Sequence, residues 1–248
     1  MTPQPLSPAA LSPAPLPPAP LRIEPLRLVI FDCDGVLVDS EGPAARVCAE
    51  EITRIGWPIT AGDSMRLFVG CNLGDMLPII EGHLGHPVPS DWIGILRNRV
   101  IDAMAHEAEP MPGAAEVLRA TAALGLPYRV ASNSSHEEMA VKFARTGLAP
   151  LVAGRLHSYR DVARGKPAPD VFLASAAAEG IPPAACMVVE DSLPGVAAAV
   201  AAGMAVLGLD LHGDGAALRA AGARPIRALS DCPALFRTAM LPAALATA

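Results

Sequence analysis

Short apolar runs alternate with stretches of helical pattern along most of the chain. The first run, Leu26–Phe31, is rich in β-branched and aromatic residues and is followed at once by an acidic turn. Comparable runs recur at Tyr128–Ser132, Cys186–Glu190 and Met204–Leu209 and, with a weaker pattern, at Arg155–Tyr159 and Pro225–Leu229. Strands that alternate with helices are typical of a parallel sheet with helices packed on it. The pattern therefore predicts an α/β fold built on a doubly wound, Rossmann-like parallel sheet.

The stretches between these strands carry residues that begin and end helices. Ser135 and Ser192 have side chains suited to cap a helix N-terminus, and glycines follow the predicted C-termini. The helices predicted in this way are Gly113–Leu124, His136–Thr146, Asp170–Glu179 and a segment from Ser192 to Gly203. Each of them is followed by one of the predicted strands, as the fold requires.

A long insertion without a good strand separates the first two predicted strands. Its four helical pieces are Pro43–Ile55, a piece opened by a Thr60–Asp63 box, a piece capped by Asn72 and interrupted by Pro78, and Asp91–Ala108 capped by Ser90. We interpret residues 43–110 as an inserted α-helical cap domain. Residues 26–42 and 111–240 are then expected to form the Rossmann-like core.

The N-terminal segment has a different composition from the rest of the chain. Nine of the first 25 residues are proline, which removes backbone donors and favours extended polyproline II. We interpret residues 1–25 as a disordered Pro-rich tail. The segment lacks a basic region followed by an apolar stretch, so it does not resemble a secretory signal.

Composition and charge narrow the class of ligand. The hydrophobic set makes up 52% of the 248 residues, which is enough for a sizeable core. A formal charge of −6 supplies no basic surface for nucleic acid or for anionic lipid. The longest uncharged apolar run, Leu193–Leu209, contains Pro194 and is too short to span a membrane. We expect a small molecule as partner, with no nucleic acid, no membrane and no obligate protein partner evident.

The cysteines indicate a reducing compartment. There are five, an odd number, and they are scattered without a C-x-x-C pair. This arrangement fits neither a disulfide framework nor a zinc site. The expected location is the cytoplasm.

Acidic and hydroxyl residues follow several predicted strands. They are Asp32, Asp34 and Asp39 after the first, Ser132 and Asn133 at the end of the second, and Glu190 and Asp191 at the end of the fourth. A turn or a helix cap would explain any one of them alone, but their shared position predicts a ligand site at the carboxyl edge of the sheet. Clustered carboxylates repel one another unless a cation neutralises them or some are protonated, and hard oxygen ligands favour Mg²⁺. We expect one bound Mg²⁺.

Lys166 adds a positive charge to this set of residues. It lies in a loop stiffened by Pro167 and Pro169, just before a predicted helix. An ordinary exposed lysine at a helix start is the alternative. Together with Mg²⁺, one lysine gives about the right counter-charge for a phosphoryl group. The residues thus indicate phosphoryl transfer, which depends on positioning and on charge stabilisation.

Four segments carry a resemblance to a known family. They are Asp32–Ser40 (DCDGVLVDS), Ala131–Ser134 (ASNS), Gly165–Asp170 (GKPAPD) and Val189–Ser192 (VEDS). In order and spacing they resemble the four motifs of the haloacid dehalogenase superfamily. The helical insertion after the first motif is similar to the C1 cap of its β-phosphoglucomutase-like branch. The resemblance extends from about Leu26 to Leu229.

The resemblance implies catalytic roles for individual residues. Asp32 would be the nucleophile that forms an aspartyl-phosphate, and Asp34 would be the general acid and base. Ser132 would bind the phosphoryl oxygens, together with backbone N–H groups near Asn133. Lys166 would neutralise the phosphoryl charge and the nucleophile.

The resemblance also implies the metal ligands. Mg²⁺ would be held by the Asp32 side chain, the main-chain carbonyl of Asp34 and the Asp191 side chain. Glu190 would reach the ion directly or through water.

Several reactions remain open within this family. The presence of Asp34 and of the Glu190–Asp191 pair disfavours a dehalogenase, which typically lacks the second aspartate and needs no metal. Sugar phosphomutases of this branch typically have a Lys just before a cap glycine, an Arg three residues after it, and a His a few residues beyond the first motif. Here the corresponding residues are Val69, Leu73 and Ala44, with Gly70 as the glycine. A phosphatase is favoured, with the phosphomutase as the alternative.

Cap loops tend to select the substrate in this family, so Arg66, Asn72 and Asp75 are candidate specificity residues. Solvent-facing positions on amphipathic helices are the simpler explanation for them. A phosphoacceptor module or a catalytically inactive binding protein is less favoured, because receiver domains lack a large cap and all the expected polar residues are present. The expected substrate is a sugar, polyol or carboxylic-acid monophosphate.

Overall fold

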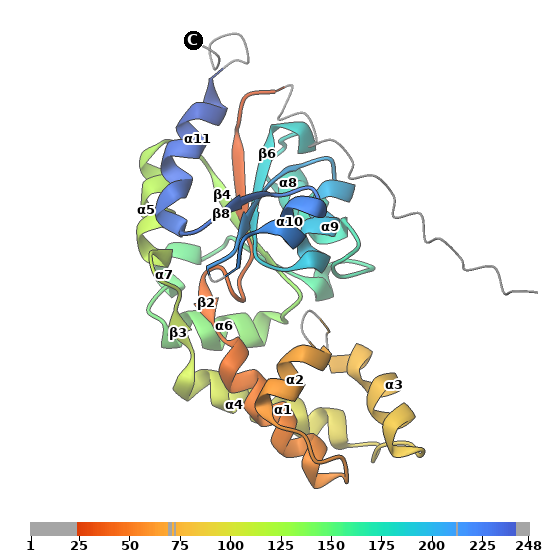
Figure 1. Cartoon of the computed structure of the whole chain (residues 1–248). Helices are drawn as coiled ribbons and strands as arrows, with labels where there is room; N and C mark the ends of the chain where they lie inside the picture. Colours follow the sequence, from red (N-terminus) through yellow and green to blue (C-terminus); the bar gives the residue numbers. More distant parts are fainter. Residues whose placement is uncertain (1–23, 69–70, 72, 212, 242–248) are drawn as a thin grey trace, which may run out of the picture.

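A six-stranded sheet forms the centre of the molecule (Figure 1). The computed structural model describes residues 24–68, 71, 73–211 and 213–241, so most of the predicted tail lies outside the described residues. The strand order is β5-β4-β1-β6-β7-β8, and all neighbours are parallel. The strands are β1 Leu28–Phe31, β4 Tyr128–Ser132, β5 Leu156–Ser158, β6 Cys186–Glu190, β7 Ala205–Leu209 and β8 Arg224–Ile226. This arrangement confirms the predicted α/β fold.

The strands β4 and β6 occupy the predicted residues, and the others differ at their ends. The strand β1 begins at Leu28. Before it, the Leu26 amide donates to the carbonyl of Ala239 at 2.8 Å, and the Arg27 amide donates to that of Ala185, just before β6, at 2.9 Å. Side chains alternate along β1, with Val29 and Phe31 in one hydrophobic cluster and their neighbours in a second one on the opposite face. Both faces of the sheet are therefore buried.

Helices cover the two faces of the sheet. The α-helices of this part of the chain are α5 Ala114–Ala123, α6 His136–Arg145, α7 Ala149–Val152, α8 Asp170–Ala178, α9 Leu193–Ala201, α10 Ala216–Ala220 and α11 Cys232–Met240. Three single 3₁₀ turns are η1 Tyr159–Asp161, η2 Pro183–Ala185 and η3 Leu229–Asp231. Figure 1 shows α5 and α11 on one side of the sheet and α8, α9 and α10 on the other. Ser135 and Ser192 cap α6 and α9 as predicted, since each hydroxyl accepts a backbone N–H of the first turn.

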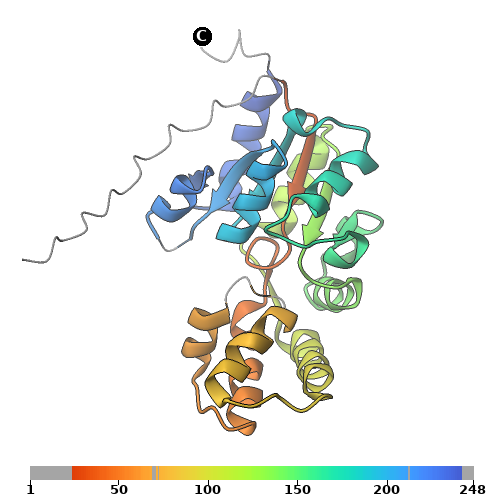
Figure 2. The ribbon, with the colours of Figure 1, turned by 90° about the vertical axis from the view of Figure 1, so that its right-hand side faces the viewer.

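The insertion folds into four helices set apart from the sheet (Figures 1 and 2). They are α1 Glu41–Arg54, α2 Ala61–Phe68, α3 Leu73–Leu84 and α4 Trp92–Glu107, which we call the helical unit. An antiparallel ribbon of β2 Val38–Asp39 and β3 Glu109–Pro110 joins the unit to the core, and α4 packs against α6. In the described ranges, no helix combines the length and the apolarity needed to cross a membrane.

Three local features that the sequence predicts for the helical unit can be compared with the structure. The Thr60–Asp63 box forms, with the Thr60 amide donating to the Asp63 carboxylate at 2.8 Å and the Asp63 amide to the Thr60 hydroxyl at 3.1 Å. The prediction that Pro78 interrupts a helix is wrong, because α3 continues through it and forgoes one backbone donor. The predicted cap at Ser90 is also wrong, since α4 begins one residue later, with Asp91 at the N-cap position. Asn72 lies outside the described residues.

Candidate active site

The ends of β1, β4 and β6 bring the predicted motifs together. The register places Phe31 beside Val130 of β4 and Val189 of β6. Asp32 therefore follows the central strand while Ser132 and Glu190 end its two neighbours at the same edge of the sheet. All three side chains are buried, at 6%, 1% and 0% exposure. This edge also lies where the connections diverge to the two halves of the sheet, which is the usual ligand position in open α/β folds.

Lys166 neutralises two of these carboxylates. Its ammonium donates to Asp32 Oδ1 at 2.5 Å and to Glu190 Oε1 at 2.8 Å. Burial by itself would lower the pKa of Lys166, but the two carboxylates outweigh burial and raise it, so the lysine is charged. The alternative of an exposed lysine is excluded, because only 7% of Lys166 is accessible.

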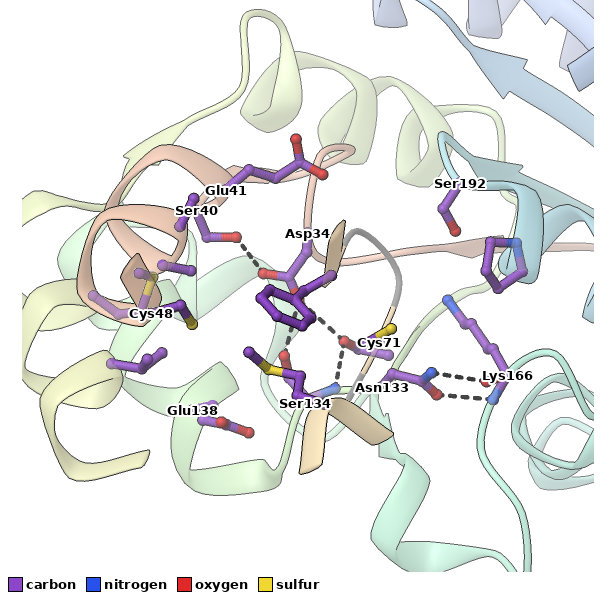
Figure 3. Close-up of a pocket in the computed structure, with 18 of the residues that line it drawn as sticks. Asp34, Ser40, Glu41, Cys48, Cys71, Asn133, Ser134, Glu138, Lys166 and Ser192 are labelled. Atoms are coloured by element: carbon purple, nitrogen blue, oxygen red, sulfur yellow. Dashed lines mark hydrogen bonds between the residues drawn. The ribbon is translucent and has the colours of Figure 1, made fainter. Parts of the chain in front are cut away.

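Asn133 positions the Lys166 loop. Its side chain accepts the Lys166 amide at 2.8 Å and donates to the Lys166 carbonyl at 3.0 Å, as Figure 3 shows. Both polar atoms of the side chain are therefore in use. The group of Asn133 that remains for substrate binding is its backbone N–H, which is the kind of donor that the resemblance implies here. The Lys166–Pro167 peptide bond is cis.

Three carboxylates form a group that could hold a cation. One oxygen each of Asp32, Glu190 and Asp191 lies within 4.8 Å of the others. Burial, reinforced by Glu190 and opposed by Lys166, raises the pKa of Asp32 to about 7. Burial and the charges of Glu190 and Asp32 raise the pKa of Asp191 to about 9. The oxygen donors and their mutual repulsion fit a small hard cation such as Mg²⁺.

Glu190 differs from its neighbours because its oxygens already have several partners. Oε1 accepts from Lys166, and Oε2 accepts the backbone N–H groups of Asp191 and Ser192, both at 2.8 Å, and the Ser192 hydroxyl at 3.0 Å. These contacts hold the side chain against the start of α9. The main role of Glu190 in this arrangement is therefore to position Lys166 and Asp191. Its direct contact with a metal stays a prediction.

Asp34 lies in a separate group of donors. Its carboxylate accepts from the Lys142 ammonium at 2.6 Å, from the Ser134 hydroxyl at 2.8 Å, from the Ser132 hydroxyl at 3.3 Å, and from the Ser40 hydroxyl. Figure 3 shows Ser40 and Ser134 beside Asp34. Burial alone would raise the pKa of Asp34, but Lys142 and the hydroxyl donors lower it. Asp34 is thus a carboxylate in this arrangement.

The four motifs include Ser40 and Ser134, for which the resemblance implied no role, and they do not include Lys142. A signal for Lys142 was present, because the chain contains only two lysines and the other is Lys166. Lys142 also occupies the buried face of α6, between Met139 and Phe143, where a lysine without a partner would be costly. An unpaired charge at that position predicts a buried carboxylate nearby.

A cavity of about 450 Å³ lies between this edge of the sheet and the helical unit. That volume is in the range of small-molecule sites. Its described lining includes Asp32, Asp34, Ser132, Asn133 and Lys166. Six lining carboxylates face three cations, so an anionic ligand requires further positive charge.

Arg66 and Asp75, the two described cap residues among those proposed from the sequence, are not among the described residues that line the cavity. Arg66 is exposed, with 74% of its side chain accessible, and its guanidinium pairs with Asp63 on the same helix. The expectation that Arg66 contacts substrate is therefore not supported by its position. Asp75 is also absent from the described lining. Asn72 lies outside the described residues, so its predicted role stays a prediction.

A family model for haloacid dehalogenase-like hydrolases matches residues 26–203. The chain belongs to this family. It is 29% identical to the 6-phosphogluconate phosphatase of Escherichia coli (strain K12), over 72% of this chain and 80% of that protein. It is 33% identical to the β-phosphoglucomutase of Mycobacterium bovis, over 65% of this chain and 63% of that protein.

Solved structures support the same family. A haloacid dehalogenase family hydrolase from Deinococcus radiodurans R1, with bound phosphate and sodium, aligns with a TM-score of 0.71 and 32% identity, over 88% of this chain and 98% of that one.

Two curated relatives from Arabidopsis thaliana are much longer than the region that aligns with this chain. The chain spans 19% of the protein SUPPRESSOR OF QUENCHING 1, chloroplastic, at 30% identity. It spans 47% of a bifunctional riboflavin kinase/FMN phosphatase, at 27% identity.

Proposed function

We propose that this haloacid dehalogenase-like hydrolase is a Mg²⁺-dependent phosphatase that hydrolyses a small phosphorylated metabolite through an aspartyl-phosphate. The observation that carries the proposal is the buried contact between Lys166 and Asp32 beside Asp191. A nucleophile, a fixed positive charge and a site for a cation then lie at one edge of the cavity. The phosphatase relative supports this class of reaction.

In the first step, an oxygen of Asp32 attacks the phosphorus as the bond from phosphorus to the leaving oxygen breaks. Asp34 gives a proton to that leaving oxygen. In the second step, Asp34 takes a proton from water, whose oxygen attacks the phosphorus and releases Asp32 and inorganic phosphate. Lys142 favours the carboxylate form of Asp34, which is the form that takes a proton from water in the second step, and donation in the first step requires that Asp34 be protonated beforehand.

The remaining residues of the site stabilise charge. Lys166 neutralises Asp32 and the incoming phosphoryl group, and Ser132 donates its hydroxyl to a phosphoryl oxygen. Mg²⁺, held by the side chains of Asp32 and Asp191 and the main-chain carbonyl of Asp34, would supply positive charge to the phosphoryl oxygens. Glu190 orients this set of residues from the start of α9.

We further propose that residues 43–110 act as a cap that covers the cavity and excludes bulk water, with residues 26–42 and 111–240 as the catalytic core.

All five cysteines lie within the described residues and none forms a disulfide. This supports a reducing compartment, and we propose the cytoplasm.

The proposed nucleophile gives the direct test. Asp32→Asn should abolish release of inorganic phosphate from any ester that the wild-type enzyme hydrolyses with Mg²⁺, because phosphate-monoester hydrolysis is extremely slow without the catalyst. Asp102→Asn on α4, whose side chain is 80% exposed, is the matched control and should keep wild-type turnover. Near-normal activity of Asp32→Asn would refute the assignment.

The alternative is a phosphomutase, which the Mycobacterium bovis relative favours. Each ester should be followed both for free phosphate and for isomeric phosphates. A phosphatase yields phosphate in proportion to the substrate consumed. Isomer formation without net release of phosphate would instead establish the phosphomutase.

A further inference from the structure

The two sides of the cavity differ in chemistry. The sheet edge contributes the charged groups described above, whereas the helical unit contributes a mainly apolar wall. Of the described lining residues in α1 to α4, the charged and hydroxyl side chains are Glu41, Ser64 and Arg97. The other described side chains of this wall are apolar or contain sulfur, such as those of Phe68 and Met104. We call it the apolar wall.

The polar groups of the wall offer little to a polyhydroxylated ligand. Ser64 is 2% exposed and its hydroxyl bonds with the thiol of Cys48. Glu41 is the first residue of α1 and is exposed, so water already satisfies its carboxylate. The hydroxyls of a sugar or polyol that reached this wall would lose water without gaining equivalent partners. An apolar organic group meets no such penalty.

Arg97 is the exception on the apolar wall. It lies on α4, half-buried, and within the described part of the chain it forms no hydrogen bond or ion pair. The two other cations that line the cavity are already paired, Lys166 with Asp32 and Lys142 with Asp34. Arg97 is therefore the cation of the described lining that has no partner, and its planar guanidinium matches a carboxylate.

We propose that the substrate is a phosphorylated carboxylic acid with a largely apolar body, whose carboxylate binds Arg97 while its phosphoryl group meets Asp32. This inference rests on the proposed phosphatase function. It selects the carboxylic-acid class from the three classes that the sequence leaves open. A second phosphate could offer the same negative charge to Arg97, and the experiment separates the two groups.

The test uses esters that differ in body and in charge. The probes are benzyl phosphate, 4-carboxybenzyl phosphate, glucitol 6-phosphate, 6-phosphogluconate and glucitol 1,6-bisphosphate, each with full-length enzyme and Mg²⁺. We expect 4-carboxybenzyl phosphate to have the highest kcat/KM. Each carboxylate ester should exceed its neutral counterpart, and benzyl phosphate should exceed glucitol 6-phosphate.

Substitution of Arg97 should remove the preference for charge. Arg97→Met should lower kcat/KM for the two carboxylate esters by about 10- to 100-fold, the range for a hydrogen bond to a charged group, through KM rather than kcat. Benzyl phosphate should change by less than about threefold, and Arg97→Lys should recover part of the loss. Arg119→Met, which removes an exposed cation from α5 outside the cavity, should leave all five values unchanged.

Other outcomes would overturn the inference in distinguishable ways. Equal loss on all esters in Arg97→Met would show a structural role for Arg97. A wild-type preference for glucitol 6-phosphate would refute the apolar body, and a preference for the bisphosphate over 6-phosphogluconate would refute the carboxylate. In each case hydrolysis itself would uphold the proposed function. Failure to hydrolyse these esters and p-nitrophenyl phosphate would refute both.

Discussion

At the scale of single residues, the ammonium of Lys142 determines the state of Asp34. It lies 2.6 Å from the Asp34 carboxylate and 2.8 Å from the Ser134 hydroxyl, and Lys142 is only 5% exposed. Burial opposes a charged lysine, but Asp34 outweighs it and raises the Lys142 pKa. The pair therefore stays charged, and Asp34 is fixed on the side of the cavity that faces α6.

Lys142→Met should therefore impair the chemical step. Without its partner, Asp34 loses a fixed orientation, and misplacement of a reacting group by about 1 Å can cost about 10²-fold in rate. We expect kcat to fall by about that factor, with a smaller change in KM, in steady-state assays on the best ester. Arg145→Met, which removes an exposed cation from the same helix, is the control. A kcat within about threefold of wild type for Lys142→Met would contradict this role.

At the scale of elements, the first turn of α9 shapes the acidic group. Ser192 caps the helix by accepting the Gly195 amide at 3.1 Å, and its own hydroxyl donates to Glu190. A Cβ on Gly195 would lie 1.7 Å from Glu190 Oε1. Glycine is thus required at this position by the close approach of Glu190, although alanine is the better helix former elsewhere.

Gly195→Ala should accordingly destabilise the protein. We expect a loss of about 1–3 kcal/mol in the free energy of unfolding, as for other overpacked sites, together with lower activity from a displaced Glu190. Gly82→Ala in α3 is the matched control, since its Cβ would meet nothing within 4 Å, and it should be neutral or stabilising by up to about 1 kcal/mol. Urea denaturation measures both. Equal stability of the two variants would disprove the steric argument.

At the scale of the whole molecule, folding brings carboxylates from two distant segments into one buried group. Asp32 follows β1 while Glu190 and Asp191 lie at the end of β6, and oxygens of all three lie within 4.8 Å of one another. Folding adds the repulsion between Asp32 and the Glu190–Asp191 pair, because the unfolded chain separates the two segments. A divalent cation that binds the folded state would relieve the repulsion and stabilise the fold.

Burial of these carboxylates, together with their mutual repulsion, makes stability depend on pH in a definite direction. The pKa of Asp191 rises from 3.8 to about 9 on folding and that of Asp32 from 3.8 to about 7. Between about pH 4 and pH 9 the folded state then holds more protons at these groups than the unfolded state. Their contribution to stability in chelator therefore falls as the pH rises. We expect Mg²⁺ to raise Tm more at pH 8 than at pH 5.

Calorimetry of wild type and Asp191→Asn, each in chelator and in Mg²⁺, isolates this contribution from that of other titrating groups. Asp191→Asn should flatten the fall of Tm with pH and should lose most of the stabilisation by Mg²⁺. An equal rise of Tm with Mg²⁺ at the two pH values in wild type would contradict the coupling between the cation and these carboxylates.

The ends of two strands could be predicted because they depend on the local pattern of apolar and polar residues. The strands Tyr128–Ser132 and Cys186–Glu190 are continuous apolar runs bounded by polar residues, so their ends are marked in the sequence. The β2–β3 ribbon could not be predicted in this way, because each of its strands has only two residues. These strands lie on either side of the insertion in the sequence and pair only in the folded structure. The resemblance suggests Arg66 as a specificity residue because it lies in the cap, whereas the direction of its side chain, toward Asp63 and solvent, depends on how α2 packs.

The sequence by itself determined the order of strands and helices and the polar residues that end the strands, because both follow from the local alternation of side chains and from turn chemistry. Only the tertiary structure decided which groups meet in the cavity. The pairing of Lys142 with Asp34, the burial of Lys166 between Asp32 and Glu190, and the place of Arg97 on the apolar wall join residues far apart in the chain. Such contacts depend on how whole elements pack, which no local pattern specifies.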